Sequence, residues 1–233
     1  EVRTLRDTDG DLFPEAPETV AQGLALPSTL AWHEGALYVA GPEGVARLDD
    51  EDDDGVFETQ TALVDALPYE TSFWPGAIAV GPDERLYVAA GGDCWQCEGE
   101  DARAGRLLSY ALDGTDAQEV ATGFYRPGGL AWHAETGDLW LVDGGGPGAP
   151  AELNRIVPGA DYGFPGCTAG APDAPACAGT EPPAALLPAQ SSPAAIAFYE
   201  AGGFALWQGD LLVALGLVAH APDLLRHSVA LGS

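Results

Sequence analysis

Short apolar runs separated by turn-forming residues fill the chain, and one six-residue pattern recurs among them. The pattern reads Pro-x-x-[Leu/Ile]-Ala-apolar, and its copies stand about 50 residues apart, a spacing typical of repeated sheets. The copies begin at Pro27, Pro75, Pro127 and Pro193. Because each run is short and bounded by turn formers, the pattern predicts one equivalent strand in each of four repeated units.

A second apolar run follows every copy of the pattern, and a third, alternating run follows three of them. Turn formers such as Gly81, Pro82 and Asp83 join the first run to the second. The second runs are residues 37–41, 86–90, 139–143 and 211–214, and the third runs are residues 45–48, 106–110 and 153–156. Short strands, tight turns and this repeat indicate an all-β fold, a β-propeller of antiparallel blades with about four to five blades visible.

Two other folds fit the pattern less well. A β-sandwich gives turn signals about every 8–12 residues without a longer period. A helical solenoid needs apolar stripes at helical spacing, and only residues 184–187 and 220–225 are weak candidates for such a stripe. The 31 Gly and 19 Pro would also interrupt helices repeatedly.

A chain of 233 residues can bury one sizeable core, so we expect a single propeller domain over residues 1–233. Residues 1–5 have the character of the last strand of a unit whose beginning is absent. Two arrangements are open. Either this strand pairs with the last blade and closes a small ring, or the ring is incomplete at both ends of this sequence.

The charge is strongly unbalanced: nine Arg, no Lys and 36 Asp plus Glu give a formal net charge of −27. Such a field repels nucleic acids and anionic lipids, so we expect no nucleic-acid partner. The longest apolar stretch, residues 211–219, is well short of the about 20 residues that span a bilayer, so we expect no membrane insertion.

The four cysteines form two local pairs, Cys94 with Cys97 and Cys167 with Cys177, in connections rich in Gly and Pro. The wider second spacing does not fit the paired Cys-x-x-Cys knuckles of a structural zinc site, so we predict two loop disulfides. A redox-active dithiol at the first pair is disfavoured because no basic neighbour would lower a thiol pKa. Disulfides indicate an oxidising compartment, so we expect a periplasmic or secreted bacterial protein.

Alternating aspartates in residues 50–58 resemble the start of a calcium loop, with Gly55 permitting the sharp turn. The candidate ligands are Asp50, Asp52, Asp54 and Glu58. Thr61 stands where an EF-hand has its closing Glu, so the loop is not an EF-hand. The alternative is a hydrated acidic turn, because so many unpaired carboxylates repel one another.

Residues 143–167 form the most distinctive segment. Its glycines let backbone carbonyls approach a ligand or ion closely. Glu152, Asn154 and Tyr162 supply polar groups near the end of a strand, where propellers build their sites. On the residues alone, the alternative is a Gly-rich connection with aromatic side chains packed beneath it.

The wording and order of several segments resemble the glucose/sorbosone dehydrogenase family, soluble proteins that bind pyrroloquinoline quinone (PQQ) on a six-bladed propeller. The matching segments are residues 81–88, 94–97, 121–132, 137–140, 152–154, 159–165, 192–199 and 209–215. The resemblance implies a six-bladed propeller fold for this chain.

The resemblance also implies a calcium site and a cofactor site. Gly146 and Pro147 stand at the family's Gly-Pro pair, whose carbonyl oxygens bind the calcium that holds PQQ. Glu152, Asn154 and Tyr162 are then expected around the cofactor. The calcium ion would also polarise the quinone.

The chain departs from the family pattern in two places. Ala151 stands where the family usually has Asp, and residues 72–75 contain no histidine where the family has its general base. Because sugar oxidation needs a proton acceptor, we expect no PQQ-dependent oxidation above background from residues 1–233. His33 and His133 lie in equivalent turns, where we expect capping or stacking.

The resemblance thus implies a PQQ- and Ca²⁺-dependent oxidoreductase acting on an aldose, sorbosone or another small molecule. The missing histidine leaves a second interpretation open. In it, the chain is a non-catalytic extracellular propeller that acts as a calcium-stabilised binding module, with a protein partner.

Overall fold

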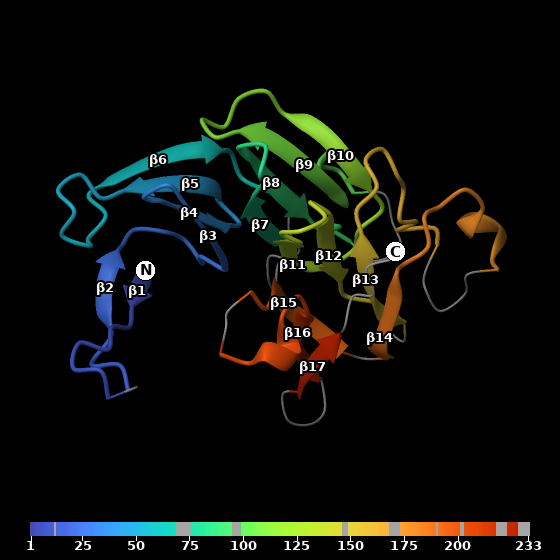
Figure 1. Cartoon of the computed structure of the whole chain (residues 1–233). Coiled ribbons are helices and arrows are strands. Elements are labelled where there is room, and N and C mark those ends of the chain that lie inside the picture. Colours follow the sequence, from blue (N-terminus) through green and yellow to red (C-terminus); the bar gives the residue numbers. More distant parts are fainter. Residues whose placement is uncertain are drawn as a thin grey trace. The chain divides into compact units, whose positions relative to one another are not determined.

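The computed structural model describes residues 1–11, 13–68, 76–94, 99–145, 149–167, 173–189, 191–200, 203–217 and 223–227 (Figure 1). These residues form 17 strands and two short 3₁₀ helices, Pro175–Cys177 and Ala205–Trp207, so the all-β prediction is confirmed. The chain divides into two compact units, Glu1–Leu67 and Pro68–Ser233, each described by itself below. That residues 1–233 act as one domain stays a prediction.

Unit 1 contains a two-stranded sheet and a four-stranded sheet, both antiparallel. The strands are β1 (Val2–Thr4), β2 (Glu18–Ala21), β3 (Thr29–His33), β4 (Ala36–Gly41), β5 (Gly44–Asp49) and β6 (Thr59–Val64), in the orders β1-β2 and β3-β4-β5-β6. Among the described strands β1 pairs only with β2, so pairing of the N-terminal strand with the last blade, one of the two arrangements left open by the sequence, is not found there. Leu37, Val39 and Leu48 of the larger sheet share a core cluster with Val2 and Val20 of the smaller one.

Unit 2 contains three sheets in which successive strands are neighbours (Figure 1). They are β7 (Gly76–Val80) to β8 (Arg85–Ala90), β9 (Arg106–Ala111) and β10 (Gln118–Thr122); β11 (Pro127–Trp132) to β12 (Leu139–Asp143), β13 (Pro150–Arg155) and β14 (Ala185–Ala189); and β15 (Ser191–Phe198) to β16 (Leu211–Leu217) and β17 (Asp223–His227). First strand β11 contacts first strands β7 and β15, as in neighbouring blades of a propeller. Of the two weak helical candidates of the sequence, residues 185–187 lie in β14 and residues 223–225 lie in β17, while residues 220–222 lie outside the described residues. In the described parts sheet pairing outweighs a short apolar stripe.

The repeated pattern marks equivalent strands, as predicted. Its Leu or Ile lies in the first strand of each sheet and pairs with an apolar residue of the second strand. These pairs are Leu30 with Val39, Ile78 with Val88, Leu130 with Leu141, and Ile196 with Val213. Gly129 shows why one copy carries glycine: a Cβ there would lie 2.7 Å from the backbone nitrogen of Ile196, so β11 and β15 nearly touch.

Apolar residues fill both gaps between the three sheets of unit 2. Tyr87, Ala89 and Leu107 of the first sheet share a cluster with Leu139 and Leu141 of the second. The other face of the second sheet packs on the third through a separate cluster that includes Trp140, Val142, Leu153, Leu211 and Val213. Alternate residues of β12 therefore face opposite neighbours, which explains why its sequence is apolar throughout.

In unit 2 the equivalent strand ends of neighbouring sheets lie close together. A Cβ on Gly144 would lie 3.7 Å from Pro193 near the start of β15, while the His133 ring lies 4.7 Å from the Phe198 ring at the end of β15. We call the end with the β8–β9 and β12–β13 connections the glycine-rich end, and the other the opposite end. At the opposite end the Thr136 backbone N–H donates to Nδ1 of His133, in agreement with the capping and stacking role expected for this histidine.

The disulfide Cys167–Cys177 is present, as predicted, with its Cα atoms 4.8 Å apart. Cys97 lies outside the described residues, so the pairing of Cys94 with it stays a prediction, although Cys94 is not a free thiol. Among the described residues, no helix has the length and apolar character that a membrane crossing requires.

Candidate functional site

Asp143 ends β12 at the glycine-rich end and is buried. Its carboxylate accepts hydrogen bonds from the backbone N–H groups of Tyr125 (2.9 Å) and Arg126 (2.6 Å). The Gly144 N–H in turn donates to the Arg126 carbonyl at 2.9 Å. Asp143 therefore fixes the connection that enters β11 against the turn that leaves β12.

Glu152 of β13 is the direct cross-strand partner of Asp143, so the two carboxylates lie on one face of the sheet. Burial first, and then the charge of Glu152, raise the pKa of Asp143 to about 8, against the lowering effect of the Tyr125 and Arg126 hydrogen bonds. Two carboxylates held this close favour either a shared proton or a bound cation.

Asn154 lies two residues beyond Glu152 on the same face, opposite Leu141. It is fully buried, and neither its amide nitrogen nor its amide oxygen has a hydrogen-bond partner within the part of the chain that the structure describes. Buried polar atoms are rarely left this way, because each loses its hydration without compensation. Both Glu152 and Asn154 were predicted as site residues, and the structure places them side by side with Asp143.

Arg126 supplies a half-buried positive charge at the same end. Its guanidinium carbon lies 5.9 Å from the centre of the Tyr125 ring, and that ring stacks on Phe164 with a centre-to-centre distance of 4.9 Å. A Cβ on Gly92 would lie 2.7 Å from Phe164, so glycine lets the neighbouring connection pass close to these rings. A cation beside aromatic faces and the carboxylates of Asp143 and Glu152 can bind a planar anion together with a metal ion.

Gly146 and Pro147, the predicted calcium ligands, lie outside the described residues, as do residues 69–75, which hold the expected base position. The turn that leads to them is described up to Gly145. A Cβ on Gly145 would collide with the carbonyl oxygens of Ala149 and Pro150, so only glycine fits there. Calcium binding by Gly146 and Pro147 stays a prediction.

Tyr162, the third predicted cofactor residue, packs in the core cluster that contains Leu141. Its hydroxyl donates to the Arg155 carbonyl at 2.6 Å and accepts the Val157 N–H at 3.0 Å, and its ring stacks on Phe124 at 5.0 Å. The side chain is 5 % exposed. These contacts give Tyr162 a packing role, and cofactor binding by it stays a prediction.

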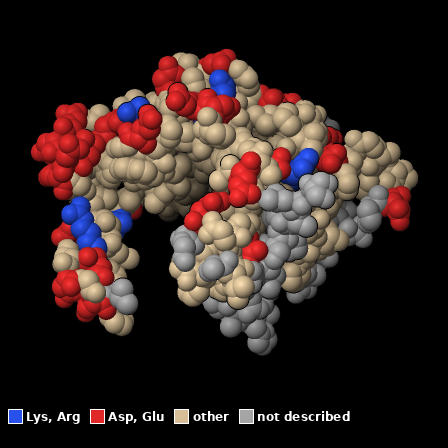
Figure 2. Space-filling model, viewed as in Figure 1, with Lys and Arg blue, Asp and Glu red and all other residues tan. Residues whose placement is uncertain are grey.

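The acidic loop 50–58 joins β5 to β6 in unit 1, where acidic side chains gather on the surface (Figure 2). Carboxylate oxygens of the four predicted ligands Asp50, Asp52, Asp54 and Glu58 lie within 4.8 Å of one another. The loop folds around them, since the Gly55 N–H donates to Asp50 at 2.8 Å and the Glu51 N–H to Glu58 at 3.1 Å. The Arg6 guanidinium packs on Gly55 and offsets part of this negative charge.

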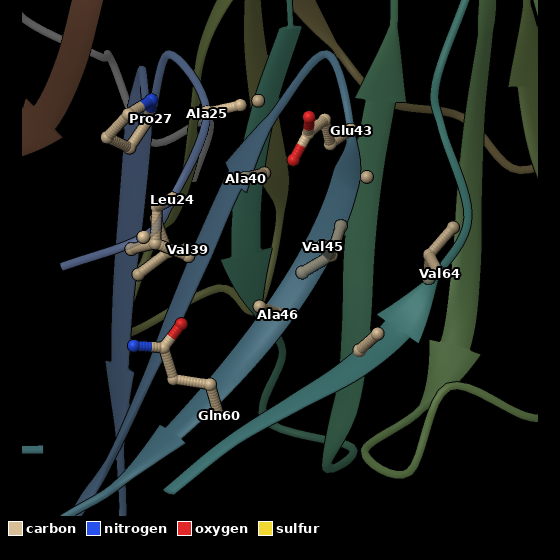
Figure 3. A pocket seen from close by; sticks show the side chains of 14 residues that line it. Leu24, Ala25, Pro27, Val39, Ala40, Glu43, Val45, Ala46, Gln60 and Val64 are labelled. Atoms are coloured by element: carbon tan, nitrogen blue, oxygen red, sulfur yellow. The ribbon is translucent and has the colours of Figure 1, made fainter. Parts of the chain in front are cut away.

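Unit 1 also contains a pocket of about 260 Å³ on one face of its four-stranded sheet (Figure 3). Small apolar residues such as Val39, Ala46 and Val64 line most of it, and Glu43 is the one ionisable residue among its lining residues. A single carboxylate without a cation or a second titratable group offers little chemistry. The glycine-rich end of unit 2 is therefore the better candidate site.

Comparison with solved structures shows the same fold in several dehydrogenases. A glucose dehydrogenase is 22% identical with a TM-score of 0.68, over 84% of this chain and 65% of that one. The PQQ-bound aldose sugar dehydrogenase of Streptomyces coelicolor is 20% identical with a TM-score of 0.60, over 89% of this chain and 83% of the other. A calcium structure of a Trichoderma reesei carbohydrate-active enzyme of family AA12 is 17% identical with a TM-score of 0.69, over 97% of this chain and 77% of the other.

This chain thus spans slightly less than two thirds of the glucose dehydrogenase it resembles. No curated protein sequence matches it significantly. The sequence profile of the Glucose / Sorbosone dehydrogenase family matches residues 39–228, which include both sheets that form the candidate site. The chain therefore belongs to the glucose/sorbosone dehydrogenase family.

Proposed function

We propose that this protein binds Ca²⁺ and PQQ at the glycine-rich end of unit 2, as a sugar dehydrogenase-like protein with a sugar or related small molecule as substrate. One observation carries the proposal. The buried carboxylate of Asp143 is paired across β12 and β13 with the partly buried carboxylate of Glu152, next to the orphaned amide of Asn154.

The residues present fit a calcium ion. Calcium takes six to eight oxygen ligands, and carboxylate, amide and backbone carbonyl oxygens are all near this end. Burial and then the charge of Glu152 raise the pKa of Asp143, and a divalent cation would offset both by favouring the ionised carboxylate. Glu152 and Asp143 would supply carboxylate oxygens, and the backbone hydrogen bonds that Asp143 accepts would fix the position of its oxygens. Carbonyl oxygens of Gly146 and Pro147 would complete the set.

The residues also fit one part of a planar anionic cofactor. Arg126 would bind a carboxylate of PQQ, while Tyr125 and Phe164 would hold the ring system and exclude water. Asp143 positions Tyr125 and Arg126, since it accepts hydrogen bonds from the backbone N–H groups of both residues. When bound, PQQ would supply the hydride acceptor for sugar oxidation, and Ca²⁺ would supply the charge that polarises the quinone.

Oxidation of the sugar also requires a group that accepts the proton of its hydroxyl. Residues 72–75 contain no histidine, so this chain offers no proton acceptor there. General-base catalysis contributes about 10²- to 10⁴-fold, and its loss leaves cofactor binding intact. We therefore expect residues 1–233 to bind PQQ and Ca²⁺ without dehydrogenase turnover above background.

A second function is favoured by the same missing histidine and by the acidic loop of unit 1. In it the protein is a non-catalytic, calcium-stabilised binding module, and Asp50, Asp52, Asp54 and Glu58 hold the ion. The Cys167–Cys177 disulfide supports a periplasmic or secreted location for either function.

Binding and turnover are measured separately to test the proposal. PQQ binding is followed by calorimetry in excess Ca²⁺, and aldose oxidation by a dye-linked assay. We expect saturable PQQ binding that Arg126→Ala and Glu152→Gln each weaken, whereas Glu135→Gln, in an exposed turn at the opposite end, leaves it unchanged. Absence of PQQ binding would favour the non-catalytic module, and turnover of roughly 1–10³ per second would show that another residue accepts the proton.

A further inference from the structure

The connection between β15 and β16 is long and carries a cluster of aromatic residues. The equivalent connections of the other sheets are residues 34–35, 81–84 and 133–138, whereas this one runs from 199 to 210. Its described part contains Tyr199, Phe204, Leu206 and Trp207. The insertion thus adds to one sheet an apolar feature that the other sheets lack.

Backbone hydrogen bonds hold the described part of the insertion in place. The Tyr199 N–H donates to the Asp210 carbonyl and the Gly209 N–H to the Tyr199 carbonyl, both at 2.9 Å, which closes its base. The Phe204 N–H donates to the Tyr199 hydroxyl at 2.9 Å. The aromatic rings are therefore presented in a fixed arrangement, which lowers the entropy cost of binding a ligand.

The rings form one cluster and remain open to solvent. Phe204 stacks on Trp207 with centres 5.0 Å apart, and Tyr199 contacts each of them at 6.0 Å. Even so, Phe204 is 60 % exposed and Leu206 is 86 % exposed. Exposed apolar side chains gathered at one place mark a contact surface more often than scattered single ones do.

The charge of the surroundings disfavours an anionic partner. Residues 199–210 contain Glu200 and Asp210 and no Arg, and the whole chain carries −27. Nucleic acids, anionic glycans and anionic lipids would be repelled. Association with a second copy is opposed by the same net charge, and four side chains are far fewer than the about 20–30 residues per partner of a stable protein interface.

A neutral sugar polymer has the matching chemistry. A pyranose ring with equatorial hydroxyls presents flat faces of C–H groups, and their positive edge suits the negative face of an aromatic ring. We propose that Tyr199, Phe204 and Trp207 form a docking surface for a neutral, β-linked glucan. It lies at the end of unit 2 opposite Asp143, so it holds a polymer outside the cofactor site and does not depend on the proposed cofactor binding.

Affinity electrophoresis of the full chain tests this surface, because the strong negative charge ensures migration in a native gel. Hydroxyethyl cellulose in the gel should retard the unmodified protein. Phe204→Ala should weaken the apparent affinity by roughly five- to tenfold, the loss expected for one ring contact. Phe204→Trp should retain binding, and Phe13→Ala, which removes another exposed Phe (75 % exposed) from unit 1, should behave like the unmodified chain.

Circular dichroism and melting first show that each variant is folded. If Phe204→Ala fails to fold, protection of tryptophan fluorescence from acrylamide by the same polymer gives a second measurement on the unmodified chain and on Trp207→Phe. The proposal predicts protection that Trp207→Phe reduces. No retardation and no protection would overturn it, as would concentration-dependent dimers in sedimentation that Phe204→Ala abolishes while the polymer has no effect.

Discussion

Replacement of Asn154 by leucine tests whether the buried amide is kept for a ligand. Leucine branches at the same carbon and faces the same apolar cluster, in which Leu141 is the cross-strand partner. Each orphaned polar atom of Asn154 costs about 1–3 kcal/mol. Burying a leucine side chain contributes about 1.5–3 kcal/mol, from which repacking a slightly larger side chain subtracts about 1–3 kcal/mol. With two orphaned atoms relieved, these terms sum to a gain of about 0.5–8 kcal/mol. Because energy terms at one site are not additive, we take the lower part of this range and expect Asn154→Leu to raise the stability of the ligand-free protein by about 1–3 kcal/mol.

The assay is thermal unfolding of the ligand-free protein, with and without added Ca²⁺ and PQQ. At about 3 °C per kcal/mol for a unit of this size, the midpoint should rise by roughly 3–9 °C. The variant should also lose the stabilisation that the ligands give the unmodified chain. Leu141→Ala is the control for the core and should cost about 2–5 kcal/mol. A lower midpoint for Asn154→Leu would refute the reasoning, because it would mean that the native amide is already satisfied, for example by an internal water.

Three further outcomes follow from particular contacts. Gly129→Ala should destabilise unit 2 by about 1–3 kcal/mol in urea unfolding, because its Cβ would meet the backbone of Ile196 at 2.7 Å. The folded pKa of Asp143, about 8, lies above its usual value of about 3.9. The stability that the protonated Asp143 gives the ligand-free protein should therefore be full below about pH 3.9 and should fall as the pH rises towards about 8. Asp143→Asn should remove this pH dependence. Cys167→Ser should lower stability by about 2–3 kcal/mol, the chain-entropy value for so short a loop, whereas an unchanged midpoint would show that the disulfide stabilises nothing.

The sequence pattern was sufficient to predict the sheets. The Pro-x-x-[Leu/Ile]-Ala pattern placed Ile78, Leu130 and Ile196 in equivalent first strands because burial between neighbouring sheets demands an apolar residue at that register. The fourth strands were harder to find. Residues 184–187 have helical spacing, and only pairing with β13 makes them part of a strand, which is a contact between distant parts of the chain.

The candidate site was predicted only in part. Glu152 and Asn154 could be found because they lie in a distinctive segment, and the strand register then places them together. The role of Asp143 depends on hydrogen bonds to backbone groups 17 and 18 residues earlier, which residue types alone do not reveal. Arg126 was passed over for a related reason: a single arginine in a strongly acidic chain becomes notable only when its backbone N–H is seen bound to a buried carboxylate. The contacts of Tyr162 could not be predicted, since the residue type does not reveal that its hydroxyl is bound to the backbone of Arg155 and Val157.

The central claim is that the glycine-rich end of unit 2 binds calcium. Calorimetry of Ca²⁺ binding to a variant whose acidic loop 50–58 has lost two of its carboxylates tests this claim most directly. Asp52→Asn with Glu58→Gln removes two of the four grouped carboxylates of unit 1 and leaves Asp143 and Glu152 intact. We predict that this double variant still binds one Ca²⁺ per chain in the presence of PQQ, and that adding Glu152→Gln abolishes the binding. Calcium binding that survives Glu152→Gln unchanged, or that is already absent from the double variant, would contradict the assignment of the metal site to the glycine-rich end of unit 2.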